Sequence, residues 1–311
     1  MNKISMLLPV YNEEQFLRHS LENTVPFVDE VIIVDGSPWG ASTDNTIEII
    51  DDFDRLYPHR INYSSGKFIL ENGSWDESAQ RNLGMSKVTG NILMPHCGDM
   101  IYTVEDMARM VSAVDKYRNR KIFYCFMVEF WLDCEHIRMY KGHAMEAWFP
   151  VMAMSDINFL SMDMFDGYYE GPKMRLKQDE NEHFLFVPNA FRYHYGWVTG
   201  FDYQVAKHIR NMSMGAWEDH GKEIVAQGDK GIAKWAINHV LEYPNMQCAY
   251  DYCGKLPIPH NYTCFDRKAE TLKFYEEKYG ERFWEEEDEE AEAEEETEDM
   301  PDIHACVRVD G

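Results

Sequence analysis

The chain has 311 residues, of which 45% are hydrophobic, and this is enough for one large α/β domain with appendages or for two modest domains. Its formal net charge is −25, and twelve of the negative charges lie between Glu285 and Asp299, so the rest of the chain still carries −13. A body this acidic repels phosphate backbones, which argues against nucleic acid or an anionic membrane as the main partner.

The first residues and the cysteines indicate the cellular compartment to expect for the protein. The first apolar run is cut by Pro9 and followed by polar residues, so we expect a strand and not a signal peptide. No window approaches the roughly 18 to 20 consecutive apolar residues that span a membrane. The seven cysteines are scattered and include no C-x-x-C pair, so we expect neither disulfides nor structural zinc, and a reducing cytoplasm.

The first half of the sequence alternates between apolar runs of strand length and amphipathic stretches. Residues 4–10 predict a buried strand, and Phe16, Leu17 and Leu21 follow it at helical spacing. Residues 29–37 repeat the pattern, and the next helix is expected to place Ile47, Ile50 and Phe53 on one face. A weaker strand at 61–63, a helix at 77–88, a strand at 92–94 and a helix at 104–117 continue the series.

Strands that are apolar on both faces and alternate with helices predict an α/β fold with a mostly parallel, doubly wound sheet. Polar clusters follow three of these strands, at residues 11–13, 35–37 and 96–99. Ligands bind beyond the carboxyl ends of the strands in such sheets, so we expect a binding site there.

The second half is less regular. Residues 121–132 read as a long strand, residues 133–200 as loops and short strands, and residues 203–212 and 230–243 as amphipathic helices. The Glu-rich run after Trp284 has no apolar periodicity, so we expect a solvated, disordered tail.

Several motifs occur in the same order and spacing as in a known family. The segments LLPVYNEEQFL, DEVIIVDGSPWGASTDNTIEI and AQRNLGMSKVTGNILM resemble the opening strand, the D-G-S turn and the A-R-N-x-G segment of family 2 glycosyltransferases with the GT-A fold. Together they cover about the first 105 residues. FRYHYGWV, residues 191–198, is similar to a shorter H-Y-G-W segment of some members.

The resemblance implies a division of the chain and an activity. Residues 1–120 would form the nucleotide-sugar-binding half of the GT-A domain, residues 121–205 the acceptor-side half with its less regular acceptor region, residues 206–284 a C-terminal helical region, and residues 285–311 the acidic tail. The implied enzyme is a metal-dependent, inverting hexosyltransferase that moves a sugar from a nucleoside diphosphate sugar, a UDP sugar by preference, to an acceptor hydroxyl. The acceptor, whether glycan, protein or small molecule, stays open.

Donor-binding residues are carried over from the motifs. The resemblance assigns the base, ribose and diphosphate of the donor to the following residues: Pro9, Tyr11, Asn12, Glu13, Asp35, Arg81, Cys97 and Gly98. A carboxylate such as Asp35 can accept an N–H of a base, and the guanidinium of Arg81 can bond a diphosphate through two N–H groups. The ordinary alternatives are a turn residue for Asp35 and a surface helix arginine for Arg81.

The family's D-x-D motif, which holds Mg²⁺ or Mn²⁺ against the pyrophosphate, is here Cys97-Gly98-Asp99. A neutral thiol is a poor ligand for hard cations, so we expect Cys97 to pack beside the ribose while Asp99 binds the metal. His194 is the second candidate ligand. The alternative is that His194 and its aromatic neighbours, Tyr193, Tyr195 and Trp197, form one wall of the cleft. His96 could join through a ring nitrogen if the ion is Mn²⁺, but we expect a hydrogen-bonded structural role for it.

An inverting transfer also needs a general base. The candidates are Asp166 and Glu170, flanked by aromatic residues, with Asp179 and Glu180 as alternatives. Two other interpretations remain open: a catalytically silent sugar-nucleotide-binding module, favoured by Cys97, and a nucleotidyltransferase, whose usual Gly-rich loop is missing from PVYNEEQF.

Overall fold

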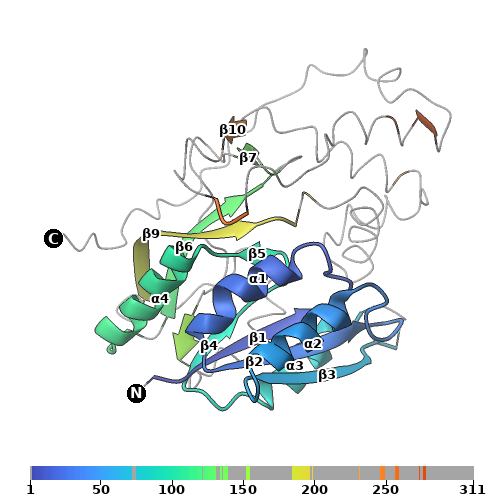
Figure 1. Ribbon diagram of the computed structural model, residues 1–311, viewed down its shortest axis with the longest axis horizontal. Helices are drawn as coiled ribbons and strands as arrows, with labels where there is room; N and C mark the ends of the chain where they lie inside the picture. The colour runs from blue at the N-terminus through green and yellow to red at the C-terminus, as the bar shows by residue number, and fades with distance from the viewer. Residues whose placement is uncertain are drawn as a thin grey trace.

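The computed structural model describes residues 2–71, 75–120, 122–130 and 184–196, together with short pieces at 134, 136–138, 152–154, 198, 231, 246–248, 256–258, 273 and 276–277 (Figure 1). Its strands are β1 Ile4–Val10, β2 Glu30–Ser37, β3 Ile61–Lys67, β4 Ile92–Pro95, β5 Met100–Ile101, β6 Ile122–Glu129, β7 His136–Arg138, β8 Met152–Met154, β9 Phe184–His194 and β10 Met246–Cys248. Its helices are α1 Leu17–Thr24, the 3-10 helix η1 Val25–Phe27, α2 Thr46–Leu56, α3 Glu77–Met85 and α4 Val104–Lys116.

One mixed sheet dominates this part of the chain. Its strand order is β3-β2-β1-β4-β8-β6-β9-β5, and β7 pairs with β10 separately. β1 is parallel to β2 and β4, β2 to β3, and β6 to β9, while β8 is antiparallel to both β4 and β6. It follows that β1, β2, β3, β4, β6 and β9 share one direction, and their carboxyl ends meet at one edge of the sheet.

Helices cover both faces of the sheet. Met6 and Leu8 of β1 share a core with residues of α1, α2 and α4, whereas Leu7 packs with Ile32 and Val34 beside α3. Successive residues of a strand point to opposite faces, so the continuous apolar run of β1 is buried on both. The predicted α/β fold class, with a mostly parallel, doubly wound sheet flanked by helices, is confirmed.

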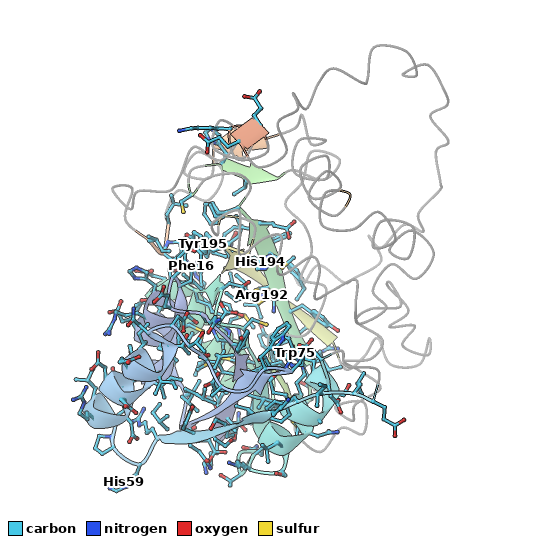
Figure 2. All side chains as sticks on the ribbon, turned by 90° about the vertical axis from the view of Figure 1, so that its right-hand side faces the viewer. Phe16, His59, Trp75, Arg192, His194 and Tyr195 are labelled. Carbon is cyan, nitrogen blue, oxygen red and sulfur yellow. The ribbon has the colours of Figure 1, made fainter. Side chains whose placement is uncertain are left out.

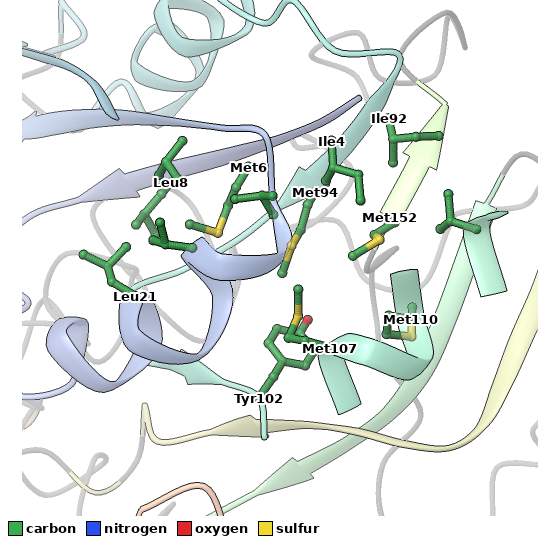
Figure 3. Packing of buried hydrophobic residues seen from close by; sticks show 14 of the residues in the cluster. Ile4, Met6, Leu8, Leu21, Ile92, Met94, Tyr102, Met107, Met110 and Met152 are labelled. Carbon is green, nitrogen blue, oxygen red and sulfur yellow. The ribbon is translucent and has the colours of Figure 1, made fainter. Parts of the chain in front are cut away.

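Methionines fill much of the core on the face of α1, α2 and α4. Those from β1, β4, β8 and α4 lie together there (Figure 3): Met6, Met94, Met107, Met110 and Met152. An unbranched thioether side chain adapts to irregular gaps, which suits a face where three helices and several strands converge.

Most elements predicted in the first 120 residues are present, with shifted ends. The third helix ends at Met85 instead of residue 88, and α2 buries Ile49 where Ile47 was expected. The strand predicted at 121–132 is β6, Ile122–Glu129. The helices predicted at 203–212 and 230–243 and the acidic tail lie outside the described residues, apart from Gly231, and the predicted domain boundaries remain predictions.

The cysteine prediction was wrong in one respect. Cys134 is disulfide-bonded, whereas Cys97 and Cys125 are free thiols. Spacing along the sequence does not report which cysteines a fold brings together, so scattered positions did not exclude a pair.

Helices in the described part of the chain are all too short and too polar to cross a membrane.

At the amino ends of the strands, Glu30 ties three chain segments together. Its carboxylate accepts hydrogen bonds from Ser5 Oγ, from Thr89 and Gly90 backbone N–H groups at 2.7 and 3.2 Å, and from Lys3 Nζ at 3.0 Å. Burial alone would raise the pKa of Glu30, but these hydrogen bonds outweigh it and lower the pKa from 4.5 to about 2.

We expect Glu30→Gln to lower the free energy of unfolding by about 2 kcal/mol at pH 7. Because the folded pKa of Glu30 is depressed, its stabilisation is complete above pH 4.5 and is lost as the pH falls towards 2. Urea unfolding at pH 7 and at pH 3 checks this: the gap between wild type and variant should shrink at pH 3. A gap that stays constant with pH would contradict it.

Candidate active site

The candidate site lies where the carboxyl ends of the strands meet. Figure 2 places His194, at the end of β9, far from His59, which precedes β3 at the opposite edge of the sheet. Asp35 stands opposite Val10 near the ends of β2 and β1, and Pro95 ends β4. Pro9 fits within β1 because the pairing of β1 with β4 ends at Leu7, so no bond to β4 needs its missing N–H.

Asp35 is fully buried at this edge. Its carboxylate accepts hydrogen bonds from the Ser42 backbone N–H at 3.0 and 3.1 Å, from Ser42 Oγ at 2.6 Å and from the Tyr63 hydroxyl at 3.1 Å. Protein donors therefore already occupy the oxygens that were predicted to accept a base N–H. Tyr63, which is 38% exposed, would have to turn away before a base could bond there.

The polar turn after β1 is fastened to the segment that precedes α2. The backbone N–H of Asn12 donates to Ser42 Oγ at 2.9 Å, and the Asn12 side-chain oxygen accepts from the Thr43 N–H at 2.8 Å. The Glu13 N–H donates to Thr46 Oγ1 at 2.8 Å. Asn12 has a φ of 54°, a left-handed conformation that asparagine tolerates better than most residues. The turn predicted to hold the base and ribose is thus rigidly built.

Three aromatic side chains line up beside this turn. The Tyr11 ring lies 5.6 Å from Trp75 in an edge-to-face contact and 6.1 Å from Trp39. Trp75 is fixed by a hydrogen bond from its Nε1 to Gln80, whereas the Trp39 side chain is 72% exposed. The structure thus places the Trp39 ring on the surface next to Tyr11.

Asp99, His194 and Glu129 come together from three strands. Asp99 precedes β5, Glu129 ends β6 and His194 ends β9 between them. His194 Nε2 lies 3.5 Å from Asp99 Oδ2, and its Nδ1 lies 3.2 Å from Glu129 Oε1. The backbone holds the arrangement, because the Tyr195 N–H donates to the Asp99 carbonyl at 2.9 Å.

The imidazole of His194 lies between two carboxylates. Burial alone would lower the pKa of His194, but Asp99 and Glu129 together raise it above its usual value. Both carboxylates are largely buried, with Asp99 5% and Glu129 6% exposed. Figure 2 shows His194 beside Arg192 and Tyr195, and stacking of Tyr195 on Phe130 at 4.3 Å packs the chain next to it.

The predicted pair of metal ligands, Asp99 and His194, is therefore brought within contact distance. Glu129 was missed, because a single glutamate at the end of an apolar strand carries no local signal. Only the register of the two strands reveals its role, because Glu129 pairs with His194 across β6 and β9.

Cys97 and Gly98 lie between β4 and Asp99. Burial raises the pKa of the Cys97 thiol to about 11, an effect to which the carboxylates of Asp99, Glu77 and Glu13 add and which Arg81 opposes. Cys97 therefore stays a neutral thiol. Gly98 contacts Glu13, since a Cβ at position 98 would lie 2.9 Å from Glu13 Cγ.

Arg81 forms a salt bridge with Glu77 one turn earlier on α3, and its side chain is 13% exposed. Its positive charge opposes the rise in the pKa of the Cys97 thiol.

His96 has a structural role. It is fully buried, and burial followed by the charge of Arg192 lowers its pKa to about 3, so it is neutral. Its Nε2 lies 2.7 Å from Ser20 Oγ, whose own hydroxyl donates to the Met100 carbonyl, so Nε2 carries the proton.

The general-base candidates, Asp166 and Glu170 with the alternatives Asp179 and Glu180, lie outside the described residues. Within the described residues, no group of three or more His, Cys, Asp or Glu side chains is arranged to hold a metal ion by itself.

Residues 5–157 match the family model described as Glycosyl transferase family 2. Residues 5–157 therefore form a glycosyl transferase family 2 domain. This confirms the family that the motifs of the first 105 residues indicate, and with it the class of enzyme. The matched segment contains the polar turns after β1 and β2, the D-x-D position and Glu129, whereas His194 lies beyond it.

Two curated relatives match a shorter stretch. The minor teichoic acid biosynthesis protein GgaA of Bacillus subtilis (strain 168) is 33% identical over 91 residues, which are 27% of this chain and 18% of the relative. Glycosyltransferase GlyA of Streptococcus pneumoniae serotype 4 is 34% identical over 94 residues, 29% of this chain and 12% of the relative. The chain thus spans less than a fifth of the length of either protein.

Among solved structures, S. aureus TarS 1-349 has a TM-score of 0.40 at 12% identity, over 77% of this chain and 81% of that one. Glucosyl-3-phosphoglycerate synthase from Mycobacterium tuberculosis, in complex with Mn²⁺, UDP and phosphoglyceric acid, has a TM-score of 0.30 at 18% identity, over 40% and 43% of the two chains.

Proposed function

We propose that the protein is a metal-dependent, inverting glycosyltransferase that moves a sugar from a nucleoside diphosphate sugar, a UDP sugar by preference, to an acceptor hydroxyl. The observation that supports this best is the meeting of Asp99, His194 and Glu129 at the carboxyl edge of the sheet. The family match indicates sugar transfer, and the cluster of Asp99, His194 and Glu129 favours a bound metal ion.

Asp99 and His194 fit a divalent cation. A carboxylate oxygen and an imidazole nitrogen 3.5 Å apart can reach one ion, and both donor types bind Mn²⁺, the carboxylate also Mg²⁺. When bound, Mn²⁺ or Mg²⁺ would neutralise charge that develops on the diphosphate leaving group. Two protein ligands leave most of the coordination to phosphate oxygens, so metal and nucleotide should bind together.

We assign the other contacts with the sugar nucleotide to the turn after β1 and to α3. Tyr11 offers a ring on which a base can stack, and Asn12, Glu13 and Gly98 lie in the same neighbourhood for the ribose. Arg81 supplies positive charge beside the D-x-D position. Asp166 and Glu170 remain our proposed general bases, and either would take the proton from the acceptor hydroxyl.

One observation favours a second candidate. Cys97 replaces the first acid of the D-x-D motif and is a neutral thiol. Loss of this acid is what we would expect in a binding module that has lost its catalytic activity. Such a module would bind the sugar nucleotide and transfer nothing.

Titration calorimetry with UDP and with GDP, each with Mn²⁺ or with EDTA, tests the proposal. We expect UDP with Mn²⁺ to bind at least about tenfold more tightly than UDP in EDTA, because the metal couples the phosphates to Asp99. Tryptophan fluorescence gives a second readout: UDP should change it, and Trp39→Phe should remove most of that change, since Trp39 is exposed beside Tyr11.

Failure of both nucleotides to bind at millimolar concentration with Mn²⁺ would contradict the proposal. Binding without hydrolysis or transfer of any of a panel of sugar nucleotides would favour the silent module instead.

A further inference from the structure

We infer that Glu129 is a positioning residue, which holds His194 with its proton on Nδ1 and so directs the Nε2 lone pair to the side where Asp99 lies. The part of this inference that concerns a metal rests on the proposed function. The part that concerns the imidazole itself does not.

The backbone places the two side chains together without help from loops. Glu129 and His194 are register partners at the ends of the parallel strands β6 and β9, so their side chains emerge on the same face. The Phe130 N–H donates to the His194 carbonyl at 3.0 Å, which continues the pairing past the strand ends. The geometry of the pair is therefore fixed by the sheet.

Hydrogen-bond chemistry then sets the tautomer. A carboxylate is an acceptor, so the 3.2 Å contact between Glu129 Oε1 and His194 Nδ1 requires the proton to be on Nδ1. Asp99 lies farther from the ring, at 3.5 Å from Nε2. Of the two carboxylates, Glu129 thus makes the closer contact, so when the ring is neutral Nε2 is the nitrogen that can bind a ligand on the Asp99 side.

Burial argues against Glu129 as the general base. Its side chain is 6% exposed and one oxygen is engaged by His194, so an acceptor hydroxyl has little access to it. Partners of this kind, behind a metal-binding histidine, fix the ring and raise its basicity, and their loss typically weakens metal binding about 10- to 100-fold.

The first test reads the tautomer without any metal. In the full chain with ¹⁵N-labelled histidine, recorded above the pH at which His194 loses its charge, the ring should be in the Nδ1–H form, with His194→Gln used to assign the signals. Glu129→Ala should lose this preference, whereas Glu129→Gln should largely keep it, because an amide oxygen still accepts from Nδ1–H. Wild type in the Nε2–H form, or a tautomer unchanged in Glu129→Ala, overturns the inference.

The second test reads the consequence for metal. Electron paramagnetic resonance of free Mn²⁺ in the presence of UDP should show about 10- to 100-fold weaker binding in Glu129→Ala, a smaller loss in Glu129→Gln, and unchanged UDP affinity in EDTA. Glu48→Gln, an exposed change of the same charge on α2, is the matched control and should bind Mn²⁺ like wild type.

The outcomes separate the two proposals. If wild type shows the Nδ1–H tautomer but no UDP-dependent Mn²⁺ binding, the metal mechanism fails and the positioning of His194 by Glu129 stands. If wild type binds Mn²⁺ with UDP and a folded Glu129→Ala binds it equally well, the positioning role fails and the proposed function stands.

Discussion

Asp99→Asn is expected to lower kcat/KM for sugar transfer by about a thousandfold, or roughly 4 kcal/mol of transition-state stabilisation. The amide keeps the shape of the side chain but removes the negative charge that faces His194 and the proposed cation. The backbone bond from the Tyr195 N–H to the Asp99 carbonyl is unaffected, so the fold should persist. The measurement is steady-state transfer with the best sugar nucleotide, alongside thermal unfolding of the variant.

Changes at Cys97 are the matched controls for Asp99. Cys97→Ala should alter turnover little, because a neutral thiol contributes nothing to a hard cation. Cys97→Asp should tighten Mn²⁺ binding, since it restores the second carboxylate of the motif. An Asp99→Asn enzyme with wild-type activity, or nucleotide binding that is equally tight in EDTA, would exclude the metal-assisted mechanism.

Strands β1, β2 and β4 could be predicted because each contains a short, continuous apolar run that is buried on both faces, whereas the polar β3 was indicated only over residues 61–63. β1 is bounded in the structure as its sequence indicates, and the polar, glycine-containing residues at the end of β2 and after β4 mark where these strands end. Signals of this kind are local, so they survive without knowledge of neighbouring strands.

The strand β9 could not be predicted for an equally physical reason. Its sequence FLFVPNAFRYH contains Pro188, and Asn189 has a φ of 58°, while the pairing with β6 shifts register between Tyr124 and Phe126. A bulge of this kind breaks the period-2 pattern. Arg192, fully buried on the same strand, adds a charge where the pattern calls for an apolar residue.

The residues of the candidate site likewise differ in whether a local sequence signal marks them. Asp99 and His194 were predicted through motifs that carry their own sequence signal, and the structure brings the two side chains together. Glu129 was not, because its importance arises from a parallel pairing between residues 65 positions apart. Asp35 was found, but the donors that surround it, Ser42 and Tyr63, follow from tertiary contacts that no motif records.

Asp35→Ala is expected to lower the free energy of unfolding by about 3 kcal/mol. The change leaves the Ser42 N–H, the Ser42 hydroxyl and the Tyr63 hydroxyl without their buried acceptor, and unmatched buried donors cost about 1 to 3 kcal/mol each. Ser42 Oγ also accepts from the Asn12 N–H, so the turn after β1 should loosen as well. Urea unfolding of both proteins gives the difference.

Tyr63→Phe separates a structural Asp35 from one that reads the base. It removes a single, partly exposed donor, so it should cost about 1 kcal/mol or less. It also opens one acceptor position on Asp35 Oδ2 for a ligand, while that oxygen keeps its bond from the Ser42 N–H. If Asp35 accepts an N–H of uracil, Tyr63→Phe should bind UDP as well as wild type or better, while Asp35→Ala should bind it more weakly. A stable Asp35→Ala protein with weakened UDP binding would show that the carboxylate serves the ligand first. A strongly destabilised one whose remaining folded fraction binds UDP normally would show that its bonds to Ser42 and Tyr63 are its main role, and that base recognition rests on Tyr11 and the turn that follows β1.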